Sequence, residues 1–241
     1  MHKIGRLLPK ILIGALLGVS IFQAWRRGDF KGIRTPRKNH SSKPYLFLLL
    51  GVPFLMVLLF PFDAFLLHAV QSLAAYPFFA SVAKFGSLIS DNIMFWIVLL
   101  AVHLLLRLAK QETGSQRFFG AILASVVTGF VCHGLKFTFL RARPYTGLSP
   151  FSFFNHAGFM SDPRAFQSFP SGDVAIVSGA AGYFFHAFPN RILRWLLFLL
   201  PLATAFARVS LNRHWVSDTV GSLWLGLTLS RGVWNYFRAN P

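Results

Sequence analysis

Acidic residues and cysteine are both scarce in this sequence. Its 241 residues include seven Asp and Glu against 24 Lys and Arg, and a single cysteine, Cys132. One cysteine excludes an internal disulfide framework and a metal site built from a cysteine cluster. Charged residues make up only 13% of the chain, about half the fraction usual in a soluble domain. This shortage of charge argues against a soluble protein.

The sequence is instead rich in hydrophobic residues. They make up 54% of the chain and gather in six blocks, 44–62, 91–109, 118–138, 172–189, 193–209 and 215–231. Blocks of this length are typical of transmembrane helices, so we predict an all-α polytopic membrane protein with a six-helix bundle. Residues 63–90 are apolar but interrupted by Pro77 and Gly86, and they predict short helices at the outer surface.

The N-terminal region is strongly basic. Residues 1–43 hold ten of the 24 Lys and Arg, which the positive-inside rule and attraction to anionic lipid explain better than nucleic-acid binding. Within it, the apolar run 11–25 predicts an interfacial helix on the cytoplasmic face, with a first transmembrane span as the alternative. We therefore divide the chain into a basic segment, 1–43, and a membrane domain, 44–241.

Basic residues also occur where the topology rule does not expect them. With the N-terminus in the cytoplasm, 17 of the 24 Lys and Arg lie on the cytoplasmic side of the membrane. The other seven are Lys84, Lys136, Arg141, Arg143, Arg164, Arg208 and Arg213. Six of these lie near the outer ends of the third and fifth spans or in the loop after the third. Positive charge on the translocated side predicts a functional use.

The first of three polar clusters on that side runs from Lys136 to Pro144. Lys136 and Arg143 are seven residues apart, which is about two helical turns, so both are expected on one side of a helix that Pro144 ends. Two cations at a membrane boundary suit a phosphate, although ordinary snorkelling at a helix end also explains them.

The second cluster is Pro170-Ser-Gly-Asp173, directly before an apolar run. Ser171 is a plausible N-cap, and Gly172 leaves backbone N–H groups accessible at a helix N-terminus, where phosphate binds readily. The simpler interpretation is a capped helix whose dipole Asp173 complements.

The third cluster runs from Arg208 to Asp218. His214 and Asp218 are four residues apart and share a face if a helix starts here. An aspartate on one ring nitrogen makes the other nitrogen a better nucleophile, and Arg208 can neutralise phosphate. A polar pair satisfied within the helix end is the alternative.

Together the clusters resemble the type 2 phosphatidic acid phosphatase superfamily, whose pattern is K-x6-RP, PSGH and SR-x5-H-x3-D. The resemblance covers about residues 90–231 and implies a metal-independent membrane phosphatase with a phosphohistidine intermediate and no cofactor. It implies His214 as nucleophile, with Asp218 orienting it. By the same resemblance, the phosphoryl group binds to Lys136, Arg143, Ser171, Gly172 and Arg208.

Two positions depart from the family pattern. Ala207 replaces a serine, and Asp173 replaces the histidine of PSGH that normally protonates the leaving group. We therefore count Asp173 as a catalytic candidate with three hypotheses. It acts as a general acid, or the leaving group needs no proton, as with a diphosphate, or the protein is a pseudoenzyme that keeps a phosphate site.

The resulting expectation is a lipid phosphate phosphatase in a bacterial inner membrane, with both termini cytoplasmic and the site facing the periplasm. Candidate substrates are lipid A, undecaprenyl diphosphate and phospholipid-type lipids. A lipid phosphotransferase and a non-catalytic phosphate-lipid binder remain as alternatives. A transporter is disfavoured because the charges lie near span ends. The expected partners are the bilayer and its lipids, with no nucleic acid.

Overall fold

The computed structural model describes residues 52–239, and within that range all regular structure is helical. The all-α class is therefore confirmed. The elements are α3 (Val52–Leu59), η2 (Phe60–Phe62), α4 (Asp63–Ala74), α5 (Pro77–Ile89), α6 (Asn92–Leu108), α7 (Glu112–Phe139), η3 (Pro144–Thr146), α8 (His156–Ser161), α9 (Gly172–Ala187), α10 (Arg191–Ser210) and α11 (Val216–Ala239).

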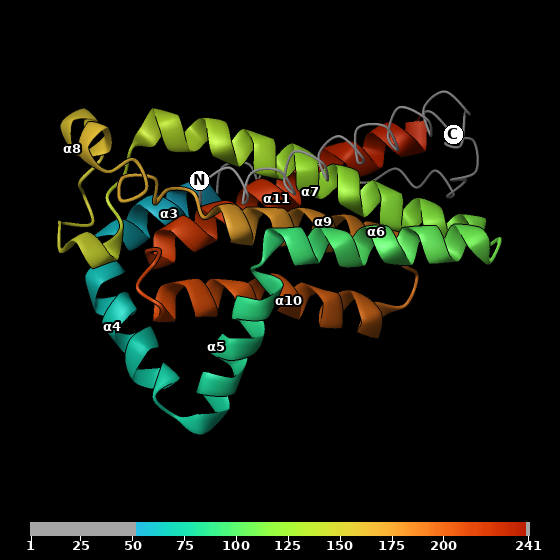
Figure 1. Cartoon of the computed structure of the whole chain (residues 1–241), viewed down its shortest axis with the longest axis horizontal. Coiled ribbons are helices and arrows are strands. Elements are labelled where there is room, and N and C mark those ends of the chain that lie inside the picture. The colour runs from blue at the N-terminus through green and yellow to red at the C-terminus, as the bar shows by residue number, and fades with distance from the viewer. Residues whose placement is uncertain (1–51, 240–241) are drawn as a thin grey trace, which may run out of the picture.

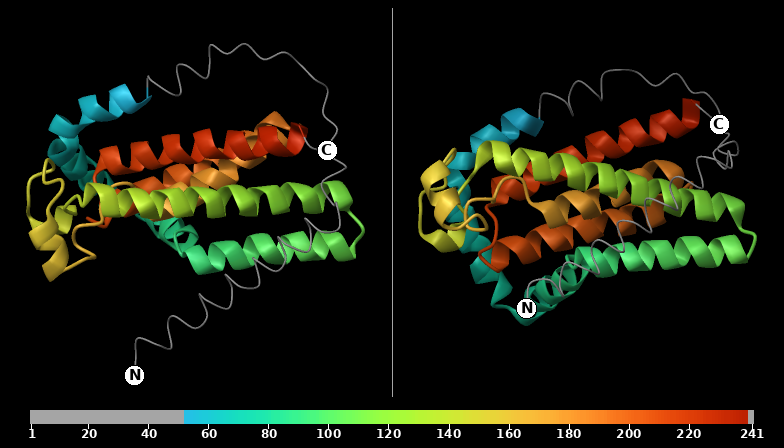
Figure 2. Two further views of the ribbon diagram at one scale, coloured as in Figure 1. Left: turned by 90° about the horizontal axis from the view of Figure 1, so that it is seen from above. Right: turned by 45° about the horizontal axis from the view of Figure 1, so that its top comes forward.

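Five long helices, α6, α7, α9, α10 and α11, run side by side as a bundle (Figures 1 and 2). Helix α9 lies at its centre and packs against α7, α10 and α11. Its sequence is rich in Gly, Ala and Ser, and most of its residues are buried, so neighbouring backbones can approach closely. A Cβ added at Gly226 of α11, for example, would lie 2.0 Å from Ser178 Oγ of α9.

Each of the last five predicted spans coincides with one of these five helices. By length and composition, three stretches of the described chain can cross a membrane: Val57–Ala74, Glu112–Thr146 and Arg191–Ser210. A fourth is added if α5 and α6, bent by 70° at their junction, count as one span. The six-span count stays a prediction. The 1–43 segment, the helix 11–25 and the start of the 44–62 span lie outside the described residues.

Residues 63–90 form two helices, α4 and α5, that make a V beside the bundle, with α5 packed on α10 (Figure 1). The segment is interrupted directly before Pro77, which is the first residue of α5, whereas Gly86 does not interrupt it as expected because it lies inside α5. A Cβ at Gly86 would lie 2.0 Å from the carbonyl oxygen of Ala203 on α10. The glycine permits a close helix crossing and does not break the helix.

One end of the bundle gathers the polar clusters. The C-termini of α7 and α10 meet the N-termini of α9 and α11 there, at the left of Figure 1, and the connection from α7 to α9, which includes α8, lies at the same end. Since each of the three clusters is next to one of these helix ends, the fold brings all three together.

Candidate active site

A cavity of about 400 Å³ opens at this end of the bundle. It is lined by Ser87, Arg143, Asp173, Arg208, Leu211, Arg213 and His214. Four of the eight predicted site residues therefore line it: Arg143, Asp173, Arg208 and His214. The other four, Lys136, Ser171, Gly172 and Asp218, lie around it in the contacts described below.

Asp173, in the first turn of α9, is held by residues from two other helices. Its Oδ1 accepts a hydrogen bond from Asn92 Nδ2 at 2.8 Å. Its Oδ2 lies 2.7 Å from Arg208 Nε, in an ion pair whose N–H is not aligned for a hydrogen bond. Arg208 also donates from Nη2 to the Ser90 carbonyl oxygen at 3.2 Å. The aspartate is thus fixed between α6 and α10.

His214 precedes α11, which begins at Val216, so it does not share a helical face with Asp218 as predicted. The two side chains still meet. Both are buried, and His214 Nδ1 lies 3.6 Å from Asp218 Oδ2, which is longer than a direct hydrogen bond. The same oxygen accepts from Ser168 Oγ at 2.5 Å and from the Trp215 backbone N–H at 2.9 Å. These two donors fix the carboxylate beside the imidazole.

Behind Asp218 lies a buried ion network that the sequence analysis missed. Arg141 donates from Nη1 to Asp218 Oδ1 at 2.6 Å and from Nη2 to Asp63 Oδ2 at 2.7 Å. The three charged side chains are fully buried. Ser217 joins them, because both its backbone N–H and its hydroxyl donate to Asp63. Arg141 therefore links α4 to the start of α11 and positions the carboxylate behind His214.

Lys136 and Arg143 converge by a different route from the one predicted. Helix α7 ends at Phe139, because Leu140 adopts a left-handed conformation with φ of 42°. Arg143 is therefore in the following loop, not two turns further along a helix. Both side chains nevertheless reach the carbonyl oxygen of Gln167, Lys136 Nζ at 2.6 Å and Arg143 Nη2 at 3.4 Å.

Ser171 occupies the N-cap position of α9 but its hydroxyl makes no capping bond. The side chain is completely buried and its Oγ has no hydrogen-bond partner. The Nε atom of Arg143 is also buried without a hydrogen-bond partner. A Cβ at Gly172 would lie 3.6 Å from Lys136 Cε, so this helix start is next to the lysine. A buried hydroxyl and guanidinium N–H without partners fit an anion that accepts from both.

The geometry agrees with a family match. The model of the PAP2 superfamily matches residues 117–241, just over half of the chain, and this range holds all three clusters. The chain belongs to the PAP2 superfamily. Membership supports a phosphatase, a hydrolase of phosphate esters, and the apolar helices support a membrane protein.

The crystal structure of Aquifex aeolicus LpxE is similar to this PAP2 protein, with a TM-score of 0.51 and 20% sequence identity. The match covers 72% of this chain and 95% of that chain. At this identity the likeness shows the fold alone. Comparison with curated proteins gives no match.

The environment of His214 in this PAP2 protein disfavours its charged form. Burial lowers the pKa of His214 from 6.5 to about 4, and the positive charges of Arg143 and Lys136 add to this, while Asp218 acts in the opposite direction. The imidazole is therefore neutral at pH 7. A neutral ring keeps a lone pair, which is the form that can attack phosphorus.

The same shift predicts an acid-sensitive fold. Because the pKa of His214 is lower in the folded state, the unfolded state binds the proton more tightly, and stability falls as the pH drops below 6.5. By pH 5 the loss reaches about 2 kcal/mol. Unfolding temperatures of wild type, His214→Gln and His133→Gln at pH 7.5 and 5 check this. Equal losses in wild type and His214→Gln would contradict it.

Proposed function

We propose that this protein is an integral-membrane lipid phosphatase that hydrolyses a phosphomonoester or diphosphate of a lipid headgroup through a phosphohistidine at His214. The carrying observation is one cavity that places a neutral histidine among three arginines, Arg143, Arg208 and Arg213. Against them stands one carboxylate, Asp173, so the cavity is net positive and suits a phosphate.

The roles follow from the positions. His214 Nε2 attacks phosphorus, and Asp218 takes the orienting role at Nδ1, where catalytic contacts commonly tighten when substrate binds. Arg143 and Arg208 neutralise the phosphoryl oxygens from the cavity wall. Ser171 Oγ and the α9 N-terminus donate from the side next to Lys136.

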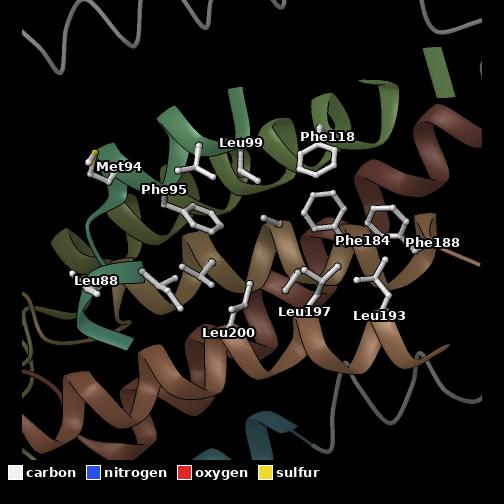
Figure 3. Close-up of a pocket in the computed structure, with 15 residues that line it drawn as sticks. Leu88, Met94, Phe95, Leu99, Phe118, Phe184, Phe188, Leu193, Leu197 and Leu200 are labelled. Atoms are coloured by element: carbon white, nitrogen blue, oxygen red, sulfur yellow. The ribbon is translucent and has the colours of Figure 1, made fainter. Parts of the chain in front are cut away.

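A second cavity supports a lipid as the substrate. It has a volume of about 520 Å³, and its lining residues come from α5, α6, α7, α9 and α10 (Figure 3). The lining begins with Leu88, next to Ser87 of the polar cavity, and ends at Phe184 and Phe188. Along α9 it extends from Val177 to Phe188, about 17 Å at 1.5 Å per residue. An apolar cavity of this length, with a lining residue that follows Ser87 of the polar cavity in the sequence, suits a hydrocarbon tail.

The topology completes the proposal. With both termini in the cytoplasm, the end of the bundle that carries His214 faces the periplasmic side of a bacterial inner membrane. There it would act on lipids of the outer leaflet. Lipid A, undecaprenyl diphosphate and phospholipid-type lipids present an anionic phosphate at that depth.

Phosphate release by purified protein from a panel of these lipids tests the function. We expect release without added metal and no loss in a chelator, because side-chain cations neutralise the phosphoryl group. Loss of activity on chelation, restored by a divalent metal, would contradict this mechanism. Phosphate binding with no release would indicate a non-catalytic binder, and transfer to an added lipid alcohol a phosphotransferase.

A further inference from the structure

Asp173 is the position where this chain differs from the family pattern in a group that moves protons. We infer that Asp173 is a specificity-determining residue that restricts the enzyme to lipid diphosphates, because a carboxylate stands where a proton donor is expected. The inference rests on the proposed function and names the substrate class of the same site.

The contacts of Asp173 are those of an ionised carboxylate. Its two oxygens face donors, Asn92 Nδ2 at 2.8 Å and Arg208 Nε at 2.7 Å. Both contacts present a nitrogen to the carboxylate, whereas a protonated carboxyl would direct its O–H at an acceptor. The charged groups that share its cavity, Arg143 and Arg213, are also cations. Asp173 therefore accepts protons here and has none to give.

The remaining lining of the cavity supplies no replacement acid. The three arginines do not lose their protons, Ser87 and Leu211 are not acids, and His214 is the nucleophile. Lys136 is not among the lining residues, and its Nζ donates to the Gln167 carbonyl oxygen. Among the described residues that line this cavity, none can protonate a departing oxygen.

This arrangement separates two classes of substrate. Cleavage of a phosphomonoester expels an alkoxide, a base about as strong as hydroxide, which is a poor leaving group unless it is protonated. Cleavage of a diphosphate expels a lipid phosphate whose second pKa is about 6, so it departs as an anion that is stable at pH 7. Only the first class requires a general acid, which typically contributes about 10²- to 10⁴-fold in rate.

The two steps balance without an acid. In the first, the bond between His214 Nε2 and the terminal phosphorus forms, and the bridging P–O bond breaks with its electron pair going to the departing lipid phosphate. In the second, a water oxygen bonds to phosphorus while Asp173 takes the water proton. The P–N bond breaks, its electron pair returns to Nε2, and Asp173 passes the proton to solvent.

The test compares farnesyl phosphate with farnesyl diphosphate, which share a tail and differ in the leaving group. We expect the wild-type kcat/KM to be at least about 100-fold higher for the diphosphate. Asp173→His, which restores a proton donor, should narrow this ratio at least tenfold by raising monoester turnover. Asp173→Asn should keep the preference but slow the second step, so that phosphoenzyme accumulates. Asp162→His, on the exposed loop, is the matched control and should leave the ratio unchanged.

The outcomes separate the two proposals. Equal kcat/KM values for the two substrates in the wild type would overturn the inference, whether or not Asp173→His folds, while the phosphatase function would stand. An unchanged ratio in a folded Asp173→His variant would also overturn it. Release of phosphate from neither substrate nor any lipid of the panel would overturn both.

Discussion

Replacement of His214 by glutamine is expected to reduce phosphate release at least about 10³-fold, since no other described residue that lines the cavity carries an imidazole to form the phosphohistidine. Glutamine keeps much of the buried volume and a polar group beside Asp218, but it has no nucleophilic nitrogen. The loss should appear in kcat, because the phosphate-binding cations are untouched. Initial rates of phosphate release with the preferred substrate check this.

His133→Gln is the matched control for that experiment. His133 is exposed on α7 and packs edge-on against Phe137, outside the cavity, so its replacement should leave the rate close to that of wild type. Equal activity of His214→Gln and His133→Gln would rule out His214 as the nucleophile.

Arg141→Met is expected to destabilise the protein by about 3–5 kcal/mol, because it leaves Asp63 and Asp218 buried without their cation. For a chain of this size such a loss lowers the unfolding temperature by roughly 10 °C. The variant should also lose activity, since Asp218 is no longer held beside His214. Thermal unfolding in detergent measures the first effect.

Arg164→Met tests whether the loss belongs to the network. Arg164 lies exposed in the same connection between α7 and α9, so it should unfold at the wild-type temperature. Adding Asp63→Asn to Arg141→Met should recover part of the loss, because one unpaired charge is removed. An unfolding temperature for Arg141→Met equal to that of Arg164→Met would show that the buried triad does not stabilise the fold.

Much of this architecture was accessible from the sequence. Long apolar blocks predicted the bundle helices because a continuous run of such residues is stable only when helical and shielded from water. The short spacing within each motif, combined with alternating helix directions, placed His214, Arg208 and Asp173 at one end. Apolar blocks and motif spacing are both patterns of residues close together in the chain, and a single sequence shows such patterns directly.

The features that escaped prediction depend on contacts distant in sequence. Arg141 was noted only as an outer cation, and its partner Asp63 is 78 residues away. An aspartate in an apolar segment, such as Asp63, indicates that a partner is needed, because a buried carboxylate is costly without one. No residue close to Asp63 in the sequence identifies that partner. The expectation that this helix continues to Pro144 was also wrong, because the loop that follows sets the left-handed turn at Leu140, which ends α7 at Phe139.

Asp173 is a residue whose identity the sequence showed to be unusual but whose contacts it did not predict. Its departure from the PSGH pattern was visible in the sequence, and three roles for it remained open. Its contacts with Asn92 and Arg208 join α9 to α6 and α10, and only the tertiary structure reveals them. They favour the hypothesis in which the leaving group needs no proton.

The proposed phosphohistidine at His214 is tested most directly by identifying the residue that carries phosphate during turnover. Wild type and Asp173→Asn would be mixed with farnesyl diphosphate, quenched in alkali and digested, and the peptide containing His214 analysed by tandem mass spectrometry. We predict a phosphoryl group on His214, more abundant in Asp173→Asn than in wild type. Continued phosphate release with that group on another residue, or on none in either protein, would contradict it.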